Sequence, residues 1–331
     1  MKKFDVLFTT DKGYIDIMLA SLYSFLLNSK LENIRVHIIT KDFSLEDYKS
    51  VEKIINLFPT IEVYFYPLES FNIEKYNIPK WRDGQISNSR LFFENILKPH
   101  ILNIKKLLYL DCDTITVSNL RDLKNTDSLL MCRDICCFNR YYKNLYNLDS
   151  YYNSGVIFID VDEWVKKGYE EKIIKFLENH KNIKLSYPDQ DIINCALSEH
   201  IKELPINYNL PPHAYIFNKF FSKLYFNESR RNVSHKEVEA AKNDVKIIHS
   251  YGLSGIKPWH SKFNPYNEDF MKYILEVNPN FKPDELDKIK KLVSKFPNLY
   301  RTMLLARTYM PEKIEDKVKV LALKCQNAKR K

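Results

Sequence analysis

The sequence predicts an α/β fold, with a mostly parallel sheet flanked by helices and a basic helical segment at the C-terminus. Three observations support this prediction. Short apolar runs alternate with amphipathic stretches through the first half of the chain, an order typical of strands that helices connect. The 331 residues, 45% hydrophobic and 28% charged, suffice for a full core. Finally, residues 282–331 hold 14 Lys and Arg against 6 Asp and Glu, which accounts for most of the net charge of +9.

Each predicted element follows from a local pattern. Apolar runs of strand length lie at 4–10, 34–40, 61–66, 106–110 and 153–160, with shorter runs at 129–131 and 246–248. Helical spacing of apolar residues predicts helices at 15–27, 45–57, 90–97, 161–179 and 189–197. Residues 200–245 are rich in loops, and the chain beyond Pro265 is helical and basic. We therefore expect two parts, an α/β domain at 1–265 and a helical segment at 266–331.

The C-terminal segment interleaves basic with apolar side chains. Basic amphipathic helices of this kind lie on anionic membrane surfaces, and the alternative is packing on the core with a solvated basic face. The rest of the chain is nearly neutral, and the basic segment contains no recognisable nucleic-acid module, so we expect no nucleic-acid partner.

Other features of the sequence predict a cytoplasmic location. The N-terminus has the pattern of a first strand and lacks the cleavage site of a signal peptide. No apolar run approaches the roughly 20 residues that span a bilayer. Six cysteines are too few for a disulfide framework and are expected to be free thiols. With the basic segment, these features predict a protein at the inner face of the cell membrane.

The segment LLYLDCD (107–113) places Asp111 and Asp113 at the end of a buried strand. Side chains two apart on an extended segment point the same way, so the two carboxylates converge. Alone they would repel each other, and a divalent cation such as Mn²⁺ or Mg²⁺ would remove that cost. The alternative is a solvated Asp-x-Asp turn.

A second strand, at 246–248, leads into His249 and then into Gly252, Gly255 and Lys257. Histidine is a suitable third ligand beside two carboxylates. Glycines allow the backbone to approach a phosphate closely, and a lysine can neutralise it. A lone histidine is more often structural, so this interpretation depends on the combination.

Two further segments carry polar groups at element ends. YPDQD (187–191) places acidic and amide groups at a helix start, where ordinary N-capping is the alternative. FTTDKGY (8–14) ends the first strand, where Asp11 could accept from a base or ribose and Tyr14 could stack on the base. An ordinary turn is the alternative there.

Taken together, six segments between Phe4 and His260 carry a family resemblance: FTTDKGY, SNSRL, LLYLDCD, YYNSGVIFID, YPDQDIIN and IIHSYG…KPWH. In this order they resemble the family 8 retaining glycosyltransferases, which include bacterial lipooligosaccharide galactosyltransferases and glycogenin. The resemblance implies a GT-A fold with a mixed sheet, a UDP-sugar donor carrying galactose or glucose, and a saccharide or lipid-linked glycan acceptor in bacterial surface glycan synthesis.

The resemblance also implies roles for individual residues. Asp111, Asp113 and His249 would bind Mn²⁺ or Mg²⁺. The nucleotide would contact Thr9, Asp11, Tyr14, Asp111, Cys112, Asp113, Gly252, Gly255 and Lys257. The donor sugar would lie among Arg90, Asp134, Asn153 and Asp189, with Asp189 and Gln190 as catalytic residues. The family usually has the pattern H-x-x-G-x-x-K-P-W, in which the glycine and the lysine are three apart, whereas Gly252 and Lys257 are five apart here, so either Gly252 or Gly255 can be the phosphate glycine.

The implied chemistry is transfer with retention of configuration. Gln190 would face the anomeric carbon, and an amide is a poor nucleophile, which favours attack from the face of the leaving group. Two other functions remain open. LLYLDCDTI also resembles the motif of haloacid-dehalogenase-type phosphatases, with Asp111 as nucleophile, and the chain could be a non-catalytic scaffold of the transferase type.

Overall fold

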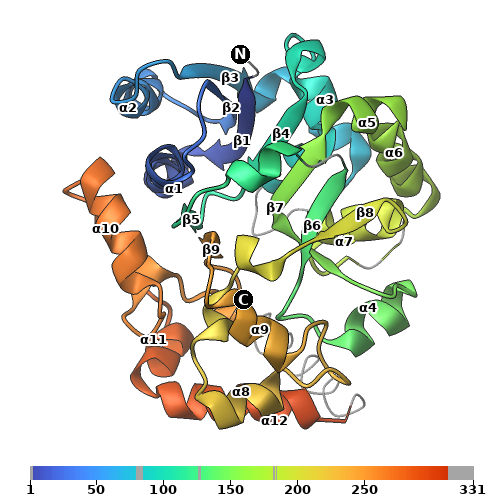
Figure 1. Ribbon diagram of the computed structural model, residues 1–331, viewed down its shortest axis with the longest axis vertical. Helices are drawn as coiled ribbons and strands as arrows, with labels where there is room; N and C mark the ends of the chain where they lie inside the picture. The colour runs from blue at the N-terminus through green and yellow to red at the C-terminus, as the bar shows by residue number, and fades with distance from the viewer. Residues whose placement is uncertain (1–2, 80–84, 126–127, 182, 184, 312–331) are drawn as a thin grey trace, which may run out of the picture.

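The structure is a computed structural model that describes residues 3–79, 85–125, 128–181, 183 and 185–311. Its centre is a seven-stranded sheet in the order β3-β2-β1-β4-β7-β6-β8 (Figure 1). The strands are β1 Phe4–Asp11, β2 Ile34–Lys41, β3 Glu62–Pro67, β4 Lys106–Leu110, β6 Leu129–Arg133, β7 Tyr152–Asp160 and β8 Ile201–Leu204. Only β7 pairs antiparallel with its neighbours, β4 and β6. The predicted mixed, mostly parallel sheet is confirmed.

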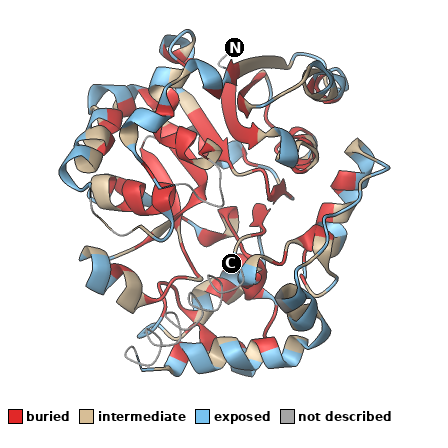
Figure 2. Cartoon of the chain, turned by 180° about the vertical axis from the view of Figure 1, so that it is seen from behind, coloured by how far each residue is buried: buried red, intermediate tan, exposed pale blue. Residues whose placement is uncertain are grey.

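Helices cover both faces of this sheet (Figure 1). The helices that the structure describes are α1 Ile15–Asn28, α2 Leu45–Ile55, α3 Phe93–Ile96, α4 Asn139–Tyr146, α5 Val161–Lys166, α6 Tyr169–Asn179, α7 Pro188–Leu197, α8 Lys219–Tyr225, α9 His235–Ala241, α10 Asn267–Val277, α11 Lys288–Lys295 and α12 Pro297–Tyr309. Because successive strand residues face opposite ways, Val6 belongs to the apolar cluster that includes α1, α2 and α10, whereas Leu7 belongs to the cluster on the other face, with α3, α5, α6 and α7. Figure 2 shows the sheet buried between these layers.

A two-stranded sheet, β5 Thr114–Thr116 with β9 Ile247–His249, lies beside the main one. A third apolar cluster joins α8, α9 and α12 below it. In α10, Phe270 and Ile274 belong to the main core, so this part of the C-terminal segment is packed against α1. The division at residue 265 into a catalytic domain and a basic segment stays a prediction, and its residues 312–331 lie outside the described part of the chain.

Several predicted elements differ in the structure. The helix expected at 161–179 is two helices, α5 and α6, because Gly168 adopts a left-handed conformation with φ of 60° between them. The helix expected at 90–97 is divided between the end of the 3₁₀ segment Ile86–Phe92 and the short helix α3. The region 200–245, expected to be rich in loops, also contains β8, α8 and α9. Their short lengths leave little periodic signal in the sequence.

The prediction of free thiols agrees with the structure as far as it is described. Five cysteines, Cys112, Cys132, Cys136, Cys137 and Cys195, are free thiols. Among the described residues, no helix is both long enough and apolar enough to cross a membrane.

Candidate active site

The predicted polar residues meet at one edge of the main sheet. Asp11 ends β1, Asp111 follows β4, and Asp134 follows β6, all at the carboxyl ends of these strands. Asn153 lies instead near the beginning of β7. Because β7 runs antiparallel to β4 and β6, its beginning lies at the edge where they end. The single reversed strand therefore brings YYNSG to the same place as LLYLDCD.

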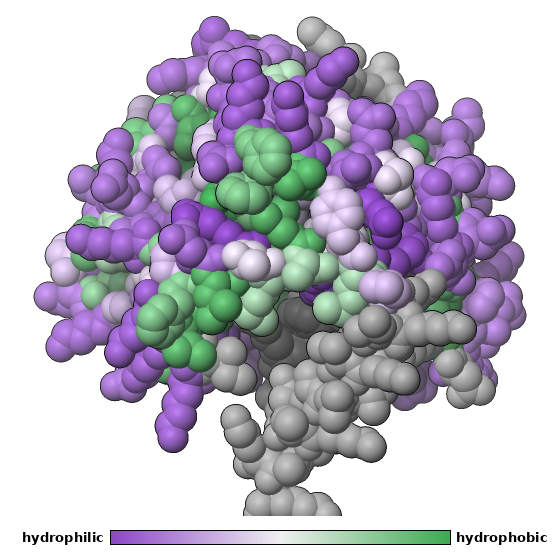
Figure 3. All heavy atoms as spheres, turned by 90° about the horizontal axis from the view of Figure 1, so that it is seen from below, coloured by the Kyte–Doolittle hydropathy of each residue, from purple (hydrophilic) through white to green (hydrophobic). Residues whose placement is uncertain are grey.

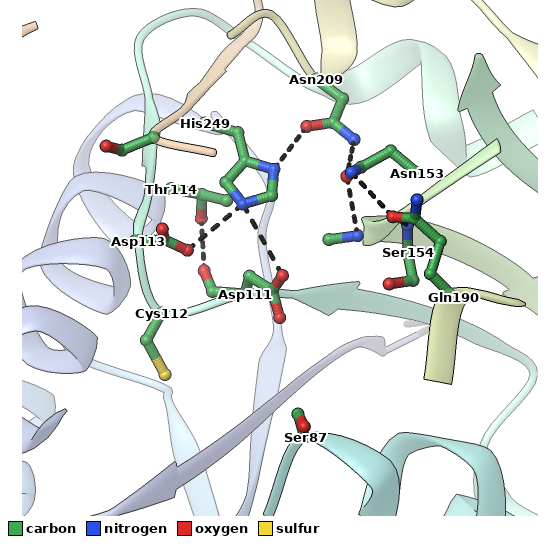
Figure 4. Close-up of polar contacts among 12 residues, drawn as sticks. Ser87, Asp111, Cys112, Asp113, Thr114, Asn153, Ser154, Gln190, Asn209 and His249 are labelled. Atoms are coloured by element: carbon green, nitrogen blue, oxygen red, sulfur yellow. Dashed lines mark hydrogen bonds and ion pairs between the residues drawn. The ribbon is translucent and has the colours of Figure 1, made fainter. Parts of the chain in front are cut away.

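Asp111, Asp113 and His249 form a compact group of potential metal ligands, whose ligand atoms lie within 4.8 Å of one another. Nε2 of His249 lies 3.2 Å from Oδ1 of Asp113 and 3.6 Å from Oδ2 of Asp111 (Figure 4). Antiparallel pairing of β5 and β9 places Thr114 opposite His249. Two carboxylates and an imidazole suit a divalent cation such as Mn²⁺.

Two basic side chains balance the carboxylates of this group. Nη2 of Arg90 lies 2.7 Å from Oδ1 of Asp111, and Nζ of Lys257 donates to Asp113. Burial by itself would raise the pKa of Asp113, but the nearby charge of Lys257 and its hydrogen bond hold that pKa well below its ordinary value. Asp113 is therefore a carboxylate at neutral pH, as a metal ligand must be.

The backbone of β7 passes directly against the metal-binding group at Gly155. A Cβ atom at residue 155 would lie 2.1 Å from Cε1 of His249 and 2.7 Å from Oδ2 of Asp111. Gly155 N–H also donates to the side chain of Asn153, and its carbonyl accepts from Asp111 N–H. No residue other than glycine fits here without moving a member of the group.

On the far side of β7, the predicted donor-sugar residues contact one another. Gln190 Nε2 donates to Asp134 at 3.1 Å, and Asn153 Nδ2 donates to Gln190 Oε1 at 2.9 Å. Asp134 Oδ1 accepts from the N–H groups of Cys136 and Cys137. Burial raises the pKa of Asp134 above its ordinary value.

Arg90 links this region to the metal-binding group. Its guanidinium lies between the carboxylates of Asp111 and Asp189, with Nε 3.3 Å from Oδ2 of Asp189. It also lies over the ring of Tyr109, 4.4 Å from the centroid, and donates to the carbonyl of Ser154 at 2.8 Å. Ser154 Oγ donates to Asp189 at 2.9 Å. One buried arginine therefore orients carboxylates from two separate segments.

The predicted nucleotide residues lie on the β1 side. Thr9 is buried, with its hydroxyl 3.1 Å from that of Tyr109, and its carbonyl accepts from the Cys112 thiol. Asp11 and Tyr14 are partly exposed at the end of β1 and the start of α1. The Tyr14 ring packs edge-on against Trp259, 5.9 Å between centroids, which joins the first segment to the last.

Gly252 and Gly255 both adopt positive φ, 79° and 75°, in the loop after β9. At Gly252 a Cβ atom would also lie 2.4 Å from Cε1 of His213, so this position requires glycine for two reasons. Lys257 follows the loop and reaches Asp113 and the carbonyl of Ser250. The choice between Gly252 and Gly255 as the phosphate glycine stays a prediction.

Comparison with known proteins identifies the family of this chain. The sequence model described as glycosyl transferase family 8 matches residues 5–263. The chain belongs to this family. This family 8 glycosyltransferase is 26% identical to a putative glycosyltransferase of Haemophilus influenzae, over 86% of this chain and 79% of the relative. It is also 26% identical to a lipopolysaccharide 1,2-glucosyltransferase of Escherichia coli, over 83% of this chain and 79% of that protein.

Solved structures confirm the predicted GT-A fold of the family 8 glycosyltransferase. The bifunctional glycosyltransferase WbbM superimposes with a TM-score of 0.67 at 18% identity, over 84% of this chain and 51% of that one. The galactosyltransferase LgtC, solved with donor and acceptor sugar analogs, superimposes with a TM-score of 0.65 at 21% identity, over 85% of this chain and 98% of that one. The phosphatase alternative is not supported, because Asp111 follows the fourth strand of a transferase fold.

Tyr109, Gly155 and Asn209 also contact members of the candidate site, and the sequence patterns did not single them out. Tyr109 donates to Asp111 at 2.7 Å, and Asn209 lies 2.7 Å from Nδ1 of His249. Tyr109 and Gly155 lie within the segments quoted above, so their spacing from Asp111 and Asn153 could have indicated that they contact the candidate site. Asn209 lies in the region expected to be rich in loops and had no signal.

Proposed function

We propose that this glycosyltransferase moves a hexosyl group, galactose or glucose, from a UDP-sugar to a saccharide or lipid-linked glycan acceptor of the bacterial surface. The observation that carries the proposal is the Asp111, Asp113 and His249 group, in direct contact with Arg90 and Lys257 at the carboxyl edge of a GT-A sheet. A relative named as a lipopolysaccharide glucosyltransferase supports the hexose and the surface glycan.

In this proposal Asp111, Asp113 and His249 hold Mn²⁺, with Mg²⁺ as the alternative. The bound ion would act as a Lewis acid on the diphosphate and stabilise the charge that develops as the sugar leaves. Lys257 now donates to Asp113, and it can turn to a phosphate oxygen once a cation takes over Asp113. Gly252 and Gly255 would let the loop backbone approach the same phosphates.

The remaining residues divide between nucleotide and sugar. Thr9, Asp11 and Tyr14 would hold uracil and ribose. Cys112 would contribute through its backbone, because its thiol is turned toward the carbonyl of Thr9. Arg90, Asp134, Asn153 and Asp189 would surround the donor sugar, whose hydroxyl groups suit carboxylate and amide partners.

For the chemical step we propose attack from the face of the leaving group, with retention of configuration. Gln190 Oε1 accepts hydrogen bonds from Asn153 Nδ2 at 2.9 Å and Ser154 N at 3.1 Å, so both its lone pairs are engaged and it is a weak nucleophile. The acceptor hydroxyl oxygen forms the new bond to the anomeric carbon as the bond to phosphate breaks. The hydroxyl proton passes to the departing UDP phosphate.

The direct test is release of UDP from a panel of UDP-sugars without acceptor, first with Mn²⁺ and then with a chelator. We expect slow hydrolysis of one hexose donor that the chelator abolishes, which would identify the donor and the need for a metal together. If the protein neither turned over any UDP-sugar nor bound UDP with Mn²⁺, that result would contradict the proposal and favour a non-catalytic scaffold.

We also propose that the protein works at the cytoplasmic face of the membrane, docked through α11 and α12. Apolar side chains on these helices are more than half exposed: Leu292, Phe296, Leu299 and Met303 at 52–58%. Lys288, Lys291 and Lys295 of α11 are also exposed. Figure 3 shows apolar clusters between hydrophilic side chains on the end of the molecule where these helices lie. This combination suits an anionic lipid surface and a lipid-linked acceptor.

Replacing Phe296, Leu299 and Met303 together by serine is expected to weaken binding to anionic vesicles at least about tenfold, because each loses apolar area that the bilayer would cover. Vesicle co-sedimentation measures this. Leu45→Ser, at a residue 80% exposed on α2, is the control and should bind as the unaltered protein does. Equal binding of the triple variant would place any membrane contact elsewhere.

A further inference from the structure

A line of hydrogen-bonded side chains connects the metal-binding group to Asp134, and one of its members, Asn209, has no role in the proposed function. Nδ1 of His249 lies 2.7 Å from Asn209 Oδ1, and Asn209 Nδ2 donates to Asn153 Oδ1 at 2.8 Å. Asn153 donates to Gln190, and Gln190 donates to Asp134. Figure 4 shows Asn209 between His249 and Asn153. The Asn209 side chain is 1% exposed.

Two backbone N–H groups of β7 determine the direction of every hydrogen bond in this line. Ser154 N–H can only donate, and it donates to Gln190 at 3.1 Å, so that atom of Gln190 is the carbonyl oxygen. Gly155 N–H donates to Asn153 at 3.0 Å and identifies the Asn153 oxygen in the same way. Asn209 must then present its NH₂ group to Asn153 and its oxygen to His249.

The position of Asn209 is fixed by backbone pairing with β9. The N–H of Leu210 donates to the carbonyl of Ile247, and the N–H of His249 donates to the carbonyl of Leu210, both at 3.0 Å. These two backbone hydrogen bonds hold residues 209 and 210 beside His249, so the Asn209 side chain lies next to the His249 ring. Asn209 can therefore orient that ring.

We propose that Asn209 is a positioning residue that holds His249 with its proton on Nδ1, so that the lone pair of Nε2 faces Asp111 and Asp113. An oxygen beside Nδ1 can only accept, and a neutral imidazole with a proton on Nδ1 carries its lone pair on Nε2. A partner of this kind behind a metal-bound histidine is typically worth 10–100-fold in metal affinity. The inference depends on the metal site of the proposed function.

The same line also couples the two ends of the site electrostatically. Each amide oxygen faces His249, and each NH₂ group faces Asp134. The aligned dipoles therefore favour a cation at His249 and an anion at Asp134. We expect occupancy of the metal site to reinforce the hydrogen bonds that orient Asn153 and Gln190.

The test compares Asn209→Leu with Asn209→Asp in the full chain, with Mn²⁺ affinity measured by electron paramagnetic resonance titration and no sugar donor present. Leucine has a similar volume but no acceptor for Nδ1, and we expect its affinity to fall about 10–100-fold. Aspartate keeps an oxygen toward Nδ1, and we expect an affinity within about threefold of the unaltered protein. Rescue by aspartate would not follow if Asn209 served only to stabilise the fold.

The matched control is Asn28→Ala, which removes two 2.8 Å side-chain hydrogen bonds, to the carbonyl of Thr116 and to Tyr273, and should leave Mn²⁺ affinity unchanged. A second readout needs no metal. In ¹⁵N-histidine NMR of the metal-free protein, with the signal assigned by loss in His249→Gln, His249 should carry its proton on Nδ1.

The outcomes separate the two claims. Equal Mn²⁺ affinity in Asn209→Leu and the unaltered protein, or an Nδ1 without a proton, would overturn the role of Asn209. Failure of the unaltered protein to bind Mn²⁺ would overturn the metal site itself, and the NMR result would still decide which tautomer Asn209 selects.

Discussion

Replacing Asp113 by asparagine is expected to remove Mn²⁺ binding and to lower glycosyl transfer by at least about a thousandfold, equivalent to about 4 kcal/mol of transition-state stabilisation. Oδ1 of Asp113 is the carboxylate oxygen nearest to Nε2 of His249, at 3.2 Å, and Lys257 contacts its other oxygen. The substitution removes one charged ligand and releases Lys257 from its partner, while it preserves the volume of the side chain. Mn²⁺ titration and the UDP-release assay measure the two effects.

The control for this substitution is Asp162→Asn. Asp162 pairs with Lys105 at 2.9 Å on the surface, and both side chains are more than 60% exposed. An exposed pair of this kind contributes at most about 1 kcal/mol, so metal binding and transfer should be unchanged. Normal Mn²⁺ affinity in Asp113→Asn would show that the metal site lies elsewhere or does not exist.

Replacing Gly155 by alanine is expected to impair both the fold and the metal site. The new methyl group would lie 2.1 Å from Cε1 of His249 and 2.7 Å from Oδ2 of Asp111, so at least one ligand must move. Inserting a methyl group into a packed region typically costs about 1–3 kcal/mol. We also expect Mn²⁺ affinity to fall at least about tenfold, since displaced ligands no longer converge.

Thermal unfolding with and without Mn²⁺ separates these two effects. The unaltered protein should be stabilised by Mn²⁺ through mass action, whereas the Gly155→Ala variant should unfold at a lower temperature that Mn²⁺ barely changes. Gly13→Ala is the matched control, because a Cβ atom there would approach no atom closer than 3.4 Å. A Gly155→Ala protein with unchanged stability and metal response would mean that β7 can shift without disturbing His249.

Much of the candidate site could be predicted because its information is local. Asp111 and Asp113 are two apart at the end of an apolar run, and the run predicts a buried strand whose carboxyl end meets the other strand ends. His249 ends a second short run. These patterns involve only neighbouring residues. A strand of several apolar residues is therefore predicted well, whereas an element too short to show a pattern is missed. The helix break at Gly168 depends on one residue in the left-handed conformation. The surrounding packing decides whether that conformation stabilises the fold.

The sequence by itself determined the class of fold, the family, and the residue types that can hold a metal and a diphosphate. Only the tertiary structure decided how these residues meet. The reversed direction of β7 brings Asn153 and Gly155 to the metal edge, and the β5–β9 pairing places His249 beside Asp113. Asn209 lies 40 positions from His249 and 56 from Asn153 in the chain, yet it hydrogen-bonds both. Such contacts depend on strand order and register, which are properties of the packed sheet and have no signature in any single segment.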